Sequence, residues 1–544
     1  MQHLKGGIVL RRRAQVRLWA DSNTLVLTMH VLLASFVAFH AYPATQDGPA
    51  HLYGAHIVAA LRRHANSPYR DFFSLNLHPV ANSLFTYLAI AVERYANINW
   101  AVRIALFAAL VGMPLSTQAF ARALRSQCRP DALYRLPVQP TTSLACLLAY
   151  NYFTYRGLFN YALSIPFVFG CLAAVLAVGA PRRSFGEQCL LALGAGVCAL
   201  LAALAHPGAL AFLLVAIAVL AVSASFEQRV VAATTATLLF FMGVESRIKG
   251  DISAPTRFMS PWSSLLSFVR ALGITQSWFE VLPACALLAA AIYAASRALP
   301  RPARVRAEWT AVWPALLACA MTLGFFVMPF EYGGAAGLNE RIPLLAVLLL
   351  LPYFELPTRL SRFWPAAFAS FAVYTAAERV RLDRSAQGIR DSAAADVIPR
   401  GSVVYALSLR VKLGAVSADL GRHLLADVAR RRELVAGTVF CSHPAHVLRC
   451  TSRTPPVGSE DAIQAFEHLS SVARGQALTN PRSPIRVSFE EVKPQAAKLR
   501  YWLVLDDSTL GPAFDRFVAA PLGARLLSNP ADPIRVYENV GAPD

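Results

Sequence analysis

The sequence predicts a polytopic α-helical membrane protein with a small C-terminal α/β domain. Three observations predict it: the composition, a series of long apolar runs, and a change of pattern near residue 380. Of the 544 residues, 56% are hydrophobic and only 15% are charged, and the mean hydropathy is +0.44. A soluble domain of average composition has about 25% charged residues. The composition therefore excludes a soluble enzyme.

The apolar runs account for the predicted membrane helices. Each is close to the roughly 20 residues that a helix needs to cross a bilayer. They lie at residues 24–44, 80–95, 99–120, 138–153, 157–179, 187–205, 208–226, 229–245, 278–297, 310–330, 341–357 and 364–380. The first has no convincing cleavage site, so we interpret it as a signal anchor. We expect about 11–12 transmembrane helices, with segment 80–95 either crossing or re-entrant.

The tail has a different pattern, in which the apolar runs shorten to strand length. Val403–Leu407, Ile485–Phe489 and Tyr501–Leu505 are typical of strands, and Asp419–Leu434 has a helical pattern. About 160 residues are enough for a separate domain. The predicted parts are a basic cytoplasmic N-terminus (1–23), a transmembrane domain (24–380) with an external loop (45–79), and a C-terminal soluble α/β domain (381–544).

The formal net charge of +19 at first suggests a nucleic-acid partner, but its distribution argues against one. Many of the Lys and Arg residues lie in short runs beside the apolar segments, as the positive-inside bias predicts. Arg11–Arg13 then place the N-terminus in the cytoplasm, and eleven crossings place the tail in the periplasm. An even number of crossings would place the tail in the cytoplasm. The composition, rich in Ala, Arg and Leu, favours a bacterial source and hence the inner membrane.

The strongest candidate for chemistry follows the first apolar run, in the segment Thr45–Tyr53 (TQDGPAHLY). A carboxylate at the external mouth of a membrane helix is partly desolvated, which raises its pKa and suits Asp47 to accept a proton. Asp47 equally suits a divalent cation such as Mg²⁺ or Mn²⁺ that bridges to a phosphate. The alternative is a capping Asp in a surface loop. We expect residues 50–64 to form a helix along the membrane surface.

This layout resembles the GT-C superfamily of membrane glycosyltransferases. The shared features are an acidic residue directly after the first helix, then a surface helix, a similar number of helices and an external C-terminal domain. The run from Asp47 to His51 is similar to an Asp-x-Pro-x-His segment of uncharacterised bacterial members. The resemblance implies that Asp47 is catalytic and that His51 lies at the substrate site. Many members carry two adjacent acids where this chain has one, which leaves metal dependence open.

Three further polar residues are predicted at the external face. Arg156 and Asn160 lie in a segment where aromatic residues gather, between Tyr155 and Tyr161. The two tyrosines have the character of interfacial anchors, whereas Arg156 and Asn160 are candidates for substrate binding. His206 lies between two apolar runs, next to Pro207 and Gly208. It is either a turn residue or a substrate ligand.

The last candidate is a Gly-rich segment that runs from Glu331 to Pro343. Glycines leave backbone N–H groups accessible, and Arg341 stands where a helix is expected to start. A guanidinium beside a helix N-terminus suits a phosphate. The alternative is a Gly-rich loop with a solvated Arg; the family resemblance favours phosphate binding. Glu331 completes the predicted substrate-binding set.

Together these residues predict a glycosyltransferase of the external membrane face. The predicted donor is a hexose or pentose on a polyprenyl phosphate, and the acceptor is a hydroxyl on a glycan, lipid or protein. The sequence has no P-loop, GxSxG, HExxH or dinucleotide-binding pattern. The rival hypothesis is a non-catalytic transporter or scaffold for lipids, sugars or envelope assembly. A transporter predicts ionisable groups at mid-membrane, which are scarce in the apolar runs.

Overall fold

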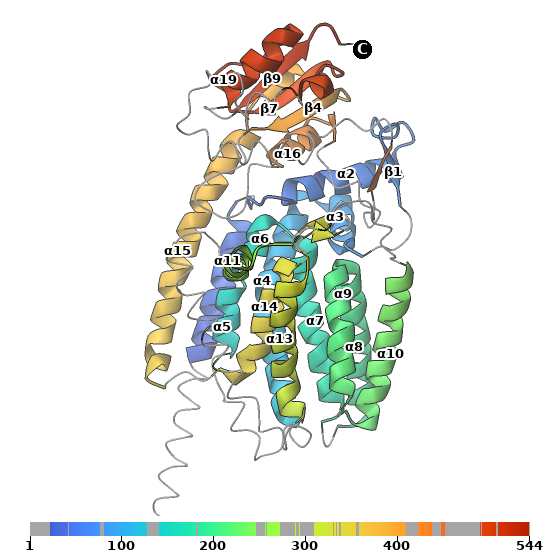
Figure 1. Cartoon of the computed structure of the whole chain (residues 1–544), viewed down its shortest axis with the longest axis vertical. Helices are drawn as coiled ribbons and strands as arrows, with labels where there is room; N and C mark the ends of the chain where they lie inside the picture. The colour runs from blue at the N-terminus through green and yellow to red at the C-terminus, as the bar shows by residue number, and fades with distance from the viewer. Residues whose placement is uncertain are drawn as a thin grey trace, which may run out of the picture. The chain divides into compact units, whose positions relative to one another are not determined.

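A computed structural model gives the fold of the chain (Figure 1). It describes residues 22–41, 43–76, 81–127, 141–180, 183–222, 224–245, 256, 258–272, 289, 293, 309–329, 331–332, 335–336, 339–354, 358–409, 423–437, 448–451, 490, 492–506 and 510–542. Almost all of the predicted apolar run 278–297 lies outside these residues. The predicted strand Ile485–Phe489 lies wholly outside them.

The chain divides into two compact units, and each is described by itself. The first comprises Met1–Ala41, Pro79–Phe85 and Arg103–Arg379, and the second comprises Tyr42–His78, Thr86–Val102 and Val380–Asp544. The C-terminal segment of the second unit begins at Val380, next to the domain boundary that the sequence predicts at residue 381. The second unit also includes most of the first loop, whereas the sequence predicts this loop as part of the transmembrane domain.

Helices make up most of the described part of the first unit. Within the described residues, five helices are long and apolar enough to cross a membrane: Ser22–Phe39, α4 (Asn99–Gln127), α7 (Phe159–Val178), α8 (Phe185–Ala205) and α13 (Trp309–Val327). The others include α5 (Thr141–Leu148), α6 (Tyr152–Arg156), α9 (Pro207–Ala221), α10 (Phe226–Glu245), α11 (Pro261–Arg270), α14 (Ile342–Leu350) and most of α15 (Thr358–Arg390). The chain is a multi-pass membrane protein, as its composition predicted.

Local sequence signals explain several helix ends. The Ser184 side chain accepts a hydrogen bond from the Glu187 backbone, and the Glu187 carboxylate accepts one from Ser184 N, so a capping box starts α8. Helix α3 (Leu84–Tyr95) has 12 residues, a length of about 18 Å at 1.5 Å per residue. This is shorter than the roughly 30 Å of a bilayer core. The helix that the run 80–95 forms is therefore too short to cross the membrane by itself.

The C-terminal part of the second unit is built on a five-stranded mixed sheet. The strand order is β5-β4-β7-β9-β8. The strands are β4 (Val403–Ser408), β5 (Val435–Ala436), β7 (Tyr501–Leu505), β8 (Ala524–Leu526) and β9 (Ile534–Asn539). Strand β4 is parallel to β5 and β7, whereas β9 is antiparallel to β7 and β8. Helix α16 (Leu424–Arg431) lies between β4 and β5 in the chain, as a parallel crossover requires. The predicted α/β tail is confirmed.

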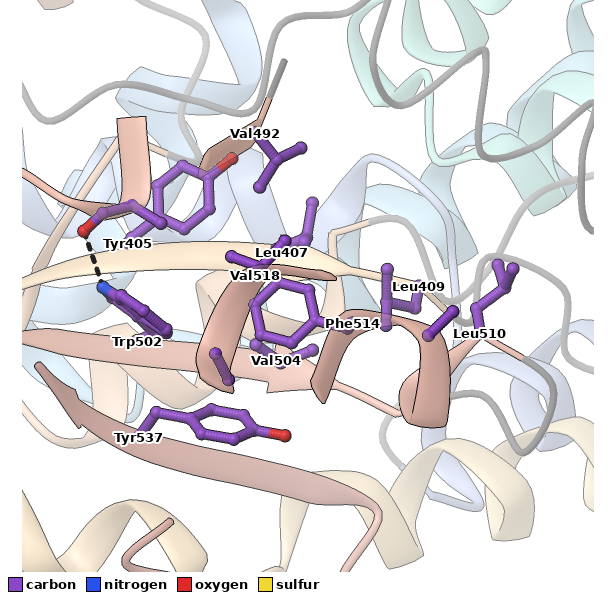
Figure 2. Packing of buried hydrophobic residues seen from close by; sticks show 13 residues of the cluster. Tyr405, Leu407, Leu409, Val492, Trp502, Val504, Leu510, Phe514, Val518 and Tyr537 are labelled. Atoms are coloured by element: carbon purple, nitrogen blue, oxygen red, sulfur yellow. Dashed lines mark hydrogen bonds between the residues drawn. The ribbon is translucent and has the colours of Figure 1, made fainter. Parts of the chain in front are cut away.

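Aromatic side chains fill the core on one face of this sheet (Figure 2). Trp502 of β7 and Tyr537 of β9 pack around Phe514, with ring centroids 6.1 Å and 5.6 Å from the Phe514 ring. The Trp502 indole N–H donates to the carbonyl of Ala496 at 2.8 Å, so its polar atom is satisfied inside the core.

The first loop is held within the second unit by α2 (Gly48–Arg63) and β1 (Phe73–Leu75). Strand β1 pairs antiparallel with β6 (Leu448–Cys450). Helix α2 packs against α16, and its residues Ala55, Val58 and Leu61 are buried. The Tyr53 hydroxyl donates to Leu434 O at 2.5 Å and accepts from Ala436 N at 3.0 Å. The predicted helix at residues 50–64 is present as α2, and α16 of the tail packs against it. Its location along the membrane surface stays a prediction.

Candidate functional site

Asp47 stands at the N-cap position of α2 but does not act as a cap. Its side chain accepts no hydrogen bond from the first turn of the helix, although the residue is only 5% exposed. Nε2 of His423, at the N-cap position of α16, lies 3.6 Å from Oδ1 of Asp47. That distance fits an ion pair and exceeds a hydrogen bond. The alternative that Asp47 is merely a helix cap is therefore not supported.

A second carboxylate binds the backbone of the segment just before Asp47. Oδ1 of Asp383, a residue that is 3% exposed, accepts a hydrogen bond from Ala44 N at 2.8 Å. His51, one helical turn after Asp47, is half-buried. Because its backbone N–H donates to Asp47 O at 3.0 Å, the two residues share the first turn of α2. The structure thus brings Asp47 and His51 together within the second unit.

The predicted divalent cation does not find a complete ligand set among the described residues. No group of three His, Cys, Asp or Glu residues in these ranges is arranged to hold a metal ion. Asp47 and His423 together offer one carboxylate and one imidazole, whereas Mg²⁺ prefers oxygen ligands in octahedral geometry. We therefore assign no chemical step to a metal.

In the first unit, Arg341 lies at the start of α14. Its carbonyl oxygen accepts a hydrogen bond from the Tyr161 hydroxyl at 2.5 Å, which ties the start of α14 to the start of α7. Arg341 is the N-cap residue of α14, and Pro343 lies in the first turn. Arg341 thus stands at the start of a helix, as predicted, directly after the 3-10 helix Asn339–Arg341. A guanidinium near a helix N-terminus suits an anion.

His206 contributes a hydrogen-bond donor beside Arg341. The residue is 7% exposed and lies between α8 and α9, with its ring centroid 5.3 Å from that of Tyr161. Its Nδ1 accepts a hydrogen bond from Gly208 N at 3.0 Å. Burial lowers the pKa of His206 well below its usual value, and the charge of Arg341 lowers it further. The imidazole is therefore neutral, and because Nδ1 accepts, Nε2 carries the proton.

Arg156 on α6 is partly neutralised by Glu340. Its Nη1 lies 3.6 Å from Oε2 of Glu340 and donates to the Tyr152 hydroxyl at 3.1 Å. The Ser267 hydroxyl donates to Oε1 of Glu340 at 3.0 Å. Next to Arg156 in the chain, Tyr155 lies under the guanidinium of Arg379, 5.6 Å from ring centroid to Cζ. The term "cationic cluster" below means Arg156, Arg341 and Arg379.

Two other predicted residues behave differently. Both polar atoms of Asn160 bind backbone: Oδ1 accepts from Phe85 N at 2.7 Å, and Nδ2 donates to Asn82 O at 2.8 Å. Asn160 thus joins the turn before α3 to α7, and we assign it no substrate contact. Glu331 lies in the short strand β2 (Glu331–Tyr332), which pairs with β3 (Ala335–Ala336). Its side chain lies outside the described part of the structure.

Sequence reasoning missed four residues at these sites: His423, Asp383, Glu340 and Arg379. Arg379 had a signal, since Phe368, Phe371, Thr375 and Arg379 follow each other at helical spacing and predict a buried face. Arg379 is only 1% exposed. His423 and Asp383 had none, because each meets the first loop only through the tertiary fold.

Comparison with known proteins adds a distant likeness. No protein-family model and no curated protein matches the chain. The solved structures that resemble it include crystal structures of ArnT from Cupriavidus metallidurans, bound to undecaprenyl phosphate and in the apo state. For each, the identity is 12%, the TM-score is 0.47, and the match covers 96% of this chain and 99% of the other. A likeness this weak carries no argument about function.

Proposed function

We propose that the chain is a glycosyltransferase that moves a sugar from a polyprenyl-phosphate donor to an acceptor hydroxyl. The observation that carries the proposal is that Arg341 and the neutral His206 both approach Tyr161, whose hydroxyl donates to Arg341 O and whose ring contacts the His206 ring. A guanidinium, a helix N-terminus and an obligatory Nε2–H donor all favour an anion. In a membrane-embedded unit, a phosphate that carries a lipid chain fits this set of donors.

Asp47 has the role of general base in this proposal. The acceptor oxygen attacks the anomeric carbon of the sugar, and the bond from that carbon to the phosphate oxygen breaks. The acceptor proton passes to the Asp47 carboxylate, while the leaving polyprenyl phosphate takes the bonding electron pair. In the first unit, Arg341 and His206 have the role of binding the phosphate of the donor. The nearby His423 orients the carboxylate of Asp47. The GT-C resemblance adds that the anomeric carbon is inverted.

Lipid binding gives the first test. Undecaprenyl phosphate, the ligand in one of the similar crystal structures, is a polyprenyl phosphate and serves as the probe. We expect native mass spectrometry of the purified protein to detect it bound, and the Arg341→Ala variant to lose most of the binding. Arg183→Ala is the matched control, because Arg183 is exposed and pairs only with Glu187 among the described residues, at 3.4 Å. Equal binding by both variants would remove the donor assignment.

The rival class is a non-catalytic transporter or scaffold. It differs in what Asp47 does, because a scaffold retains its cellular function when Asp47 is replaced by Asn and loses it when the tail is deleted. The enzyme loses its function with Asp47→Asn even when the variant inserts normally. Comparison of these two variants in cells separates the two classes.

The proposal includes a location and an acceptor class. Basic residues near the N-terminus favour a cytoplasmic location for that end, and the proposal takes the membrane to be a bacterial inner membrane with the tail in the periplasm. The acceptor is then a glycan, lipid or protein outside the cytoplasm. Labelling of single cysteines introduced into the tail, with a reagent that does not cross membranes, tests this orientation.

A further inference from the structure

We propose that the first unit contains a binding site for a neutral hydroxyl group, separate from the phosphate site, formed by His30, Tyr150 and Thr375. These side chains are 0%, 1% and 0% exposed. His30 lies on the helix Ser22–Phe39, Tyr150 lies in the turn after α5, and Thr375 lies on α15. We call this set the hydroxyl site.

Apolar side chains surround His30 and Tyr150. Val26, Cys146 and Phe368 form a buried cluster against which Met29, Leu147 and Phe371 pack. The His30 ring lies 5.5 Å from the Tyr150 ring and 6.3 Å from the Phe368 ring, between centroids. The rings of Tyr150 and Phe371 are 5.8 Å apart, and Thr375 lies one helical turn after Phe371. His30 and Tyr150 are therefore neighbours in an apolar seam, which also contains Phe371, and the buried Thr375 follows Phe371 on the same helix.

The hydrogen bond of His30 determines which chemistry its ring offers to the seam. Its Nε2 lies 3.0 Å from the carbonyl oxygen of Leu110, on α4. Because a carbonyl only accepts, Nε2 carries the proton, and Nδ1 of the neutral ring is a hydrogen-bond acceptor. Nδ1 has no hydrogen-bond partner among the described residues. An ionisable side chain in a membrane helix is costly to retain, which indicates a specific use.

The other two members of the site offer hydroxyl groups. Tyr150 Oη and Thr375 Oγ1 are buried, and neither has a hydrogen-bond partner within the described ranges. A buried polar atom without a partner is strongly unfavourable, so three in one seam indicate a polar occupant. The occupant donates to His30 Nδ1 and accepts from a hydroxyl. The three side chains include no carboxylate and no formal cation, which fits a neutral hydroxyl better than an ion.

The hydroxyl site and the cationic cluster share two elements of the structure. Tyr150 directly precedes Asn151, whose side chain caps α6 by accepting from Phe153 N and Thr154 N. Helix α6 carries Arg156. On α15, Thr375 lies one turn before Arg379. A hydroxyl bound between Tyr150 and Thr375 would therefore fix the spacing of the elements that carry two of the three arginines.

The test uses isosteric variants of the full-length protein in phosphatidylcholine nanodiscs. If a hydroxyl is bound, Tyr150→Phe and Thr375→Val each remove a satisfied hydrogen bond and lower the melting temperature by about 1–3 °C. Tyr353→Phe is the matched control, since the buried Tyr353 hydroxyl donates to Ala311 O at 2.6 Å. If the atoms have no partner, removing them leaves the melting temperature unchanged or raises it, which overturns the proposal.

A double variant tests whether the two residues bind the same hydroxyl. With a shared occupant, Tyr150→Phe combined with Thr375→Val lowers the melting temperature by less than the sum of the single shifts. Additive shifts overturn the shared site. The source of the hydroxyl follows from a second set of nanodiscs that contain 1-hexadecanol. Shifts already present in phosphatidylcholine alone identify water, and shifts that appear only with the alcohol identify a lipid hydroxyl.

Discussion

Nε2 of His423 lies 3.6 Å from Oδ1 of Asp47, although the two residues belong to opposite ends of the sequence. Asp47 begins α2 and His423 begins α16, and these helices pack against each other in the second unit. His423 thus lies beside a buried carboxylate that makes no capping bond to its own helix. This contact is the feature of the second unit that most favours a chemical role for Asp47.

We expect Asp47→Asn to lower the rate of sugar transfer by about 100-fold or more, because an amide cannot accept the acceptor proton. The measurement is kcat with saturating donor, in protein shown to insert and fold normally. Asp391→Asn is the control, because the Asp391 side chain is 58% exposed and pairs only loosely with Arg431, at 3.5 Å. Full activity of the Asp47 variant would contradict the assignment of the base.

Replacement of Arg341 is expected to act on donor binding. Arg341→Ala removes the guanidinium beside the start of α14 and should raise KM for a polyprenyl-phosphate sugar at least about tenfold, the value of one charge-assisted hydrogen bond. Arg341→Lys should recover part of the loss, because lysine retains the charge but lacks the planar fork. A KM that is unchanged in both variants would place the phosphate elsewhere.

His206 allows the capping role and the donor role to be separated. Asn is a good N-cap residue, so His206→Asn keeps an acceptor for Gly208 N while it removes the Nε2–H group. We expect this variant to fold normally and to bind donor more weakly. His206→Ala should lose both donor binding and stability.

The pH profile gives a further check on His206. Because burial and Arg341 hold the pKa of His206 well below its usual value, the ring stays neutral from about pH 6.5 upward. Donor binding should therefore show no ionisation from this residue near neutral pH. A loss of binding with a midpoint near pH 6.5 that is absent in His206→Asn would contradict the neutral-donor role.

The sequence predicted the parts of the structure that depend on local pattern. Apolar runs such as 157–179 became helices, here α7, and the strands Val403–Leu407 and Tyr501–Leu505 were found as β4 and β7. Strand β9 was not predicted from the sequence, because the charged residues Arg535 and Glu538 interrupt its apolar residues. These charges are stabilised by tertiary partners: Arg535 donates to Asp506 at 3.0 Å, and Glu538 pairs with Arg525 at 2.6 Å.

The candidate site was predicted only where a residue type and a helix boundary coincide. Arg341 and His206 are of this kind, since proline or glycine beside each marks the start of a helix. The role of Asn160 depended instead on the turn at Asn82, whose backbone has a positive φ of 68°. No local pattern predicts that such a turn binds a distant amide, so the sequence could not distinguish a structural Asn160 from a substrate ligand.

The last prediction concerns the buried carboxylate of Asp427 in the second unit and the two arginines that it binds. Asp427 of α16 is fully buried, and its carboxylate accepts from Arg390 Nε at 2.6 Å and Arg430 Nη2 at 2.7 Å. Asp427→Asn would leave these guanidinium groups buried without their counter-charge. We expect a loss of about 3–5 kcal/mol in the unfolding free energy of this unit, measured in the full-length protein by proteolysis of the tail.

The same carboxylate gives the unit an acid-sensitive stability. Burial alone would raise the pKa of Asp427, but Arg430 and Arg390 together lower it more, so the folded pKa is below its usual value. The contribution is therefore complete above the unfolded pKa of about 3.9 and is lost as the pH falls through the folded pKa. Proteolysis of the wild-type tail should accelerate below about pH 4, whereas Asp427→Asn should lack that part of the response. If the rate of proteolysis depends on pH in the same way in the wild type and in Asp427→Asn, the Asp427 carboxylate does not contribute to this acid-sensitive stability.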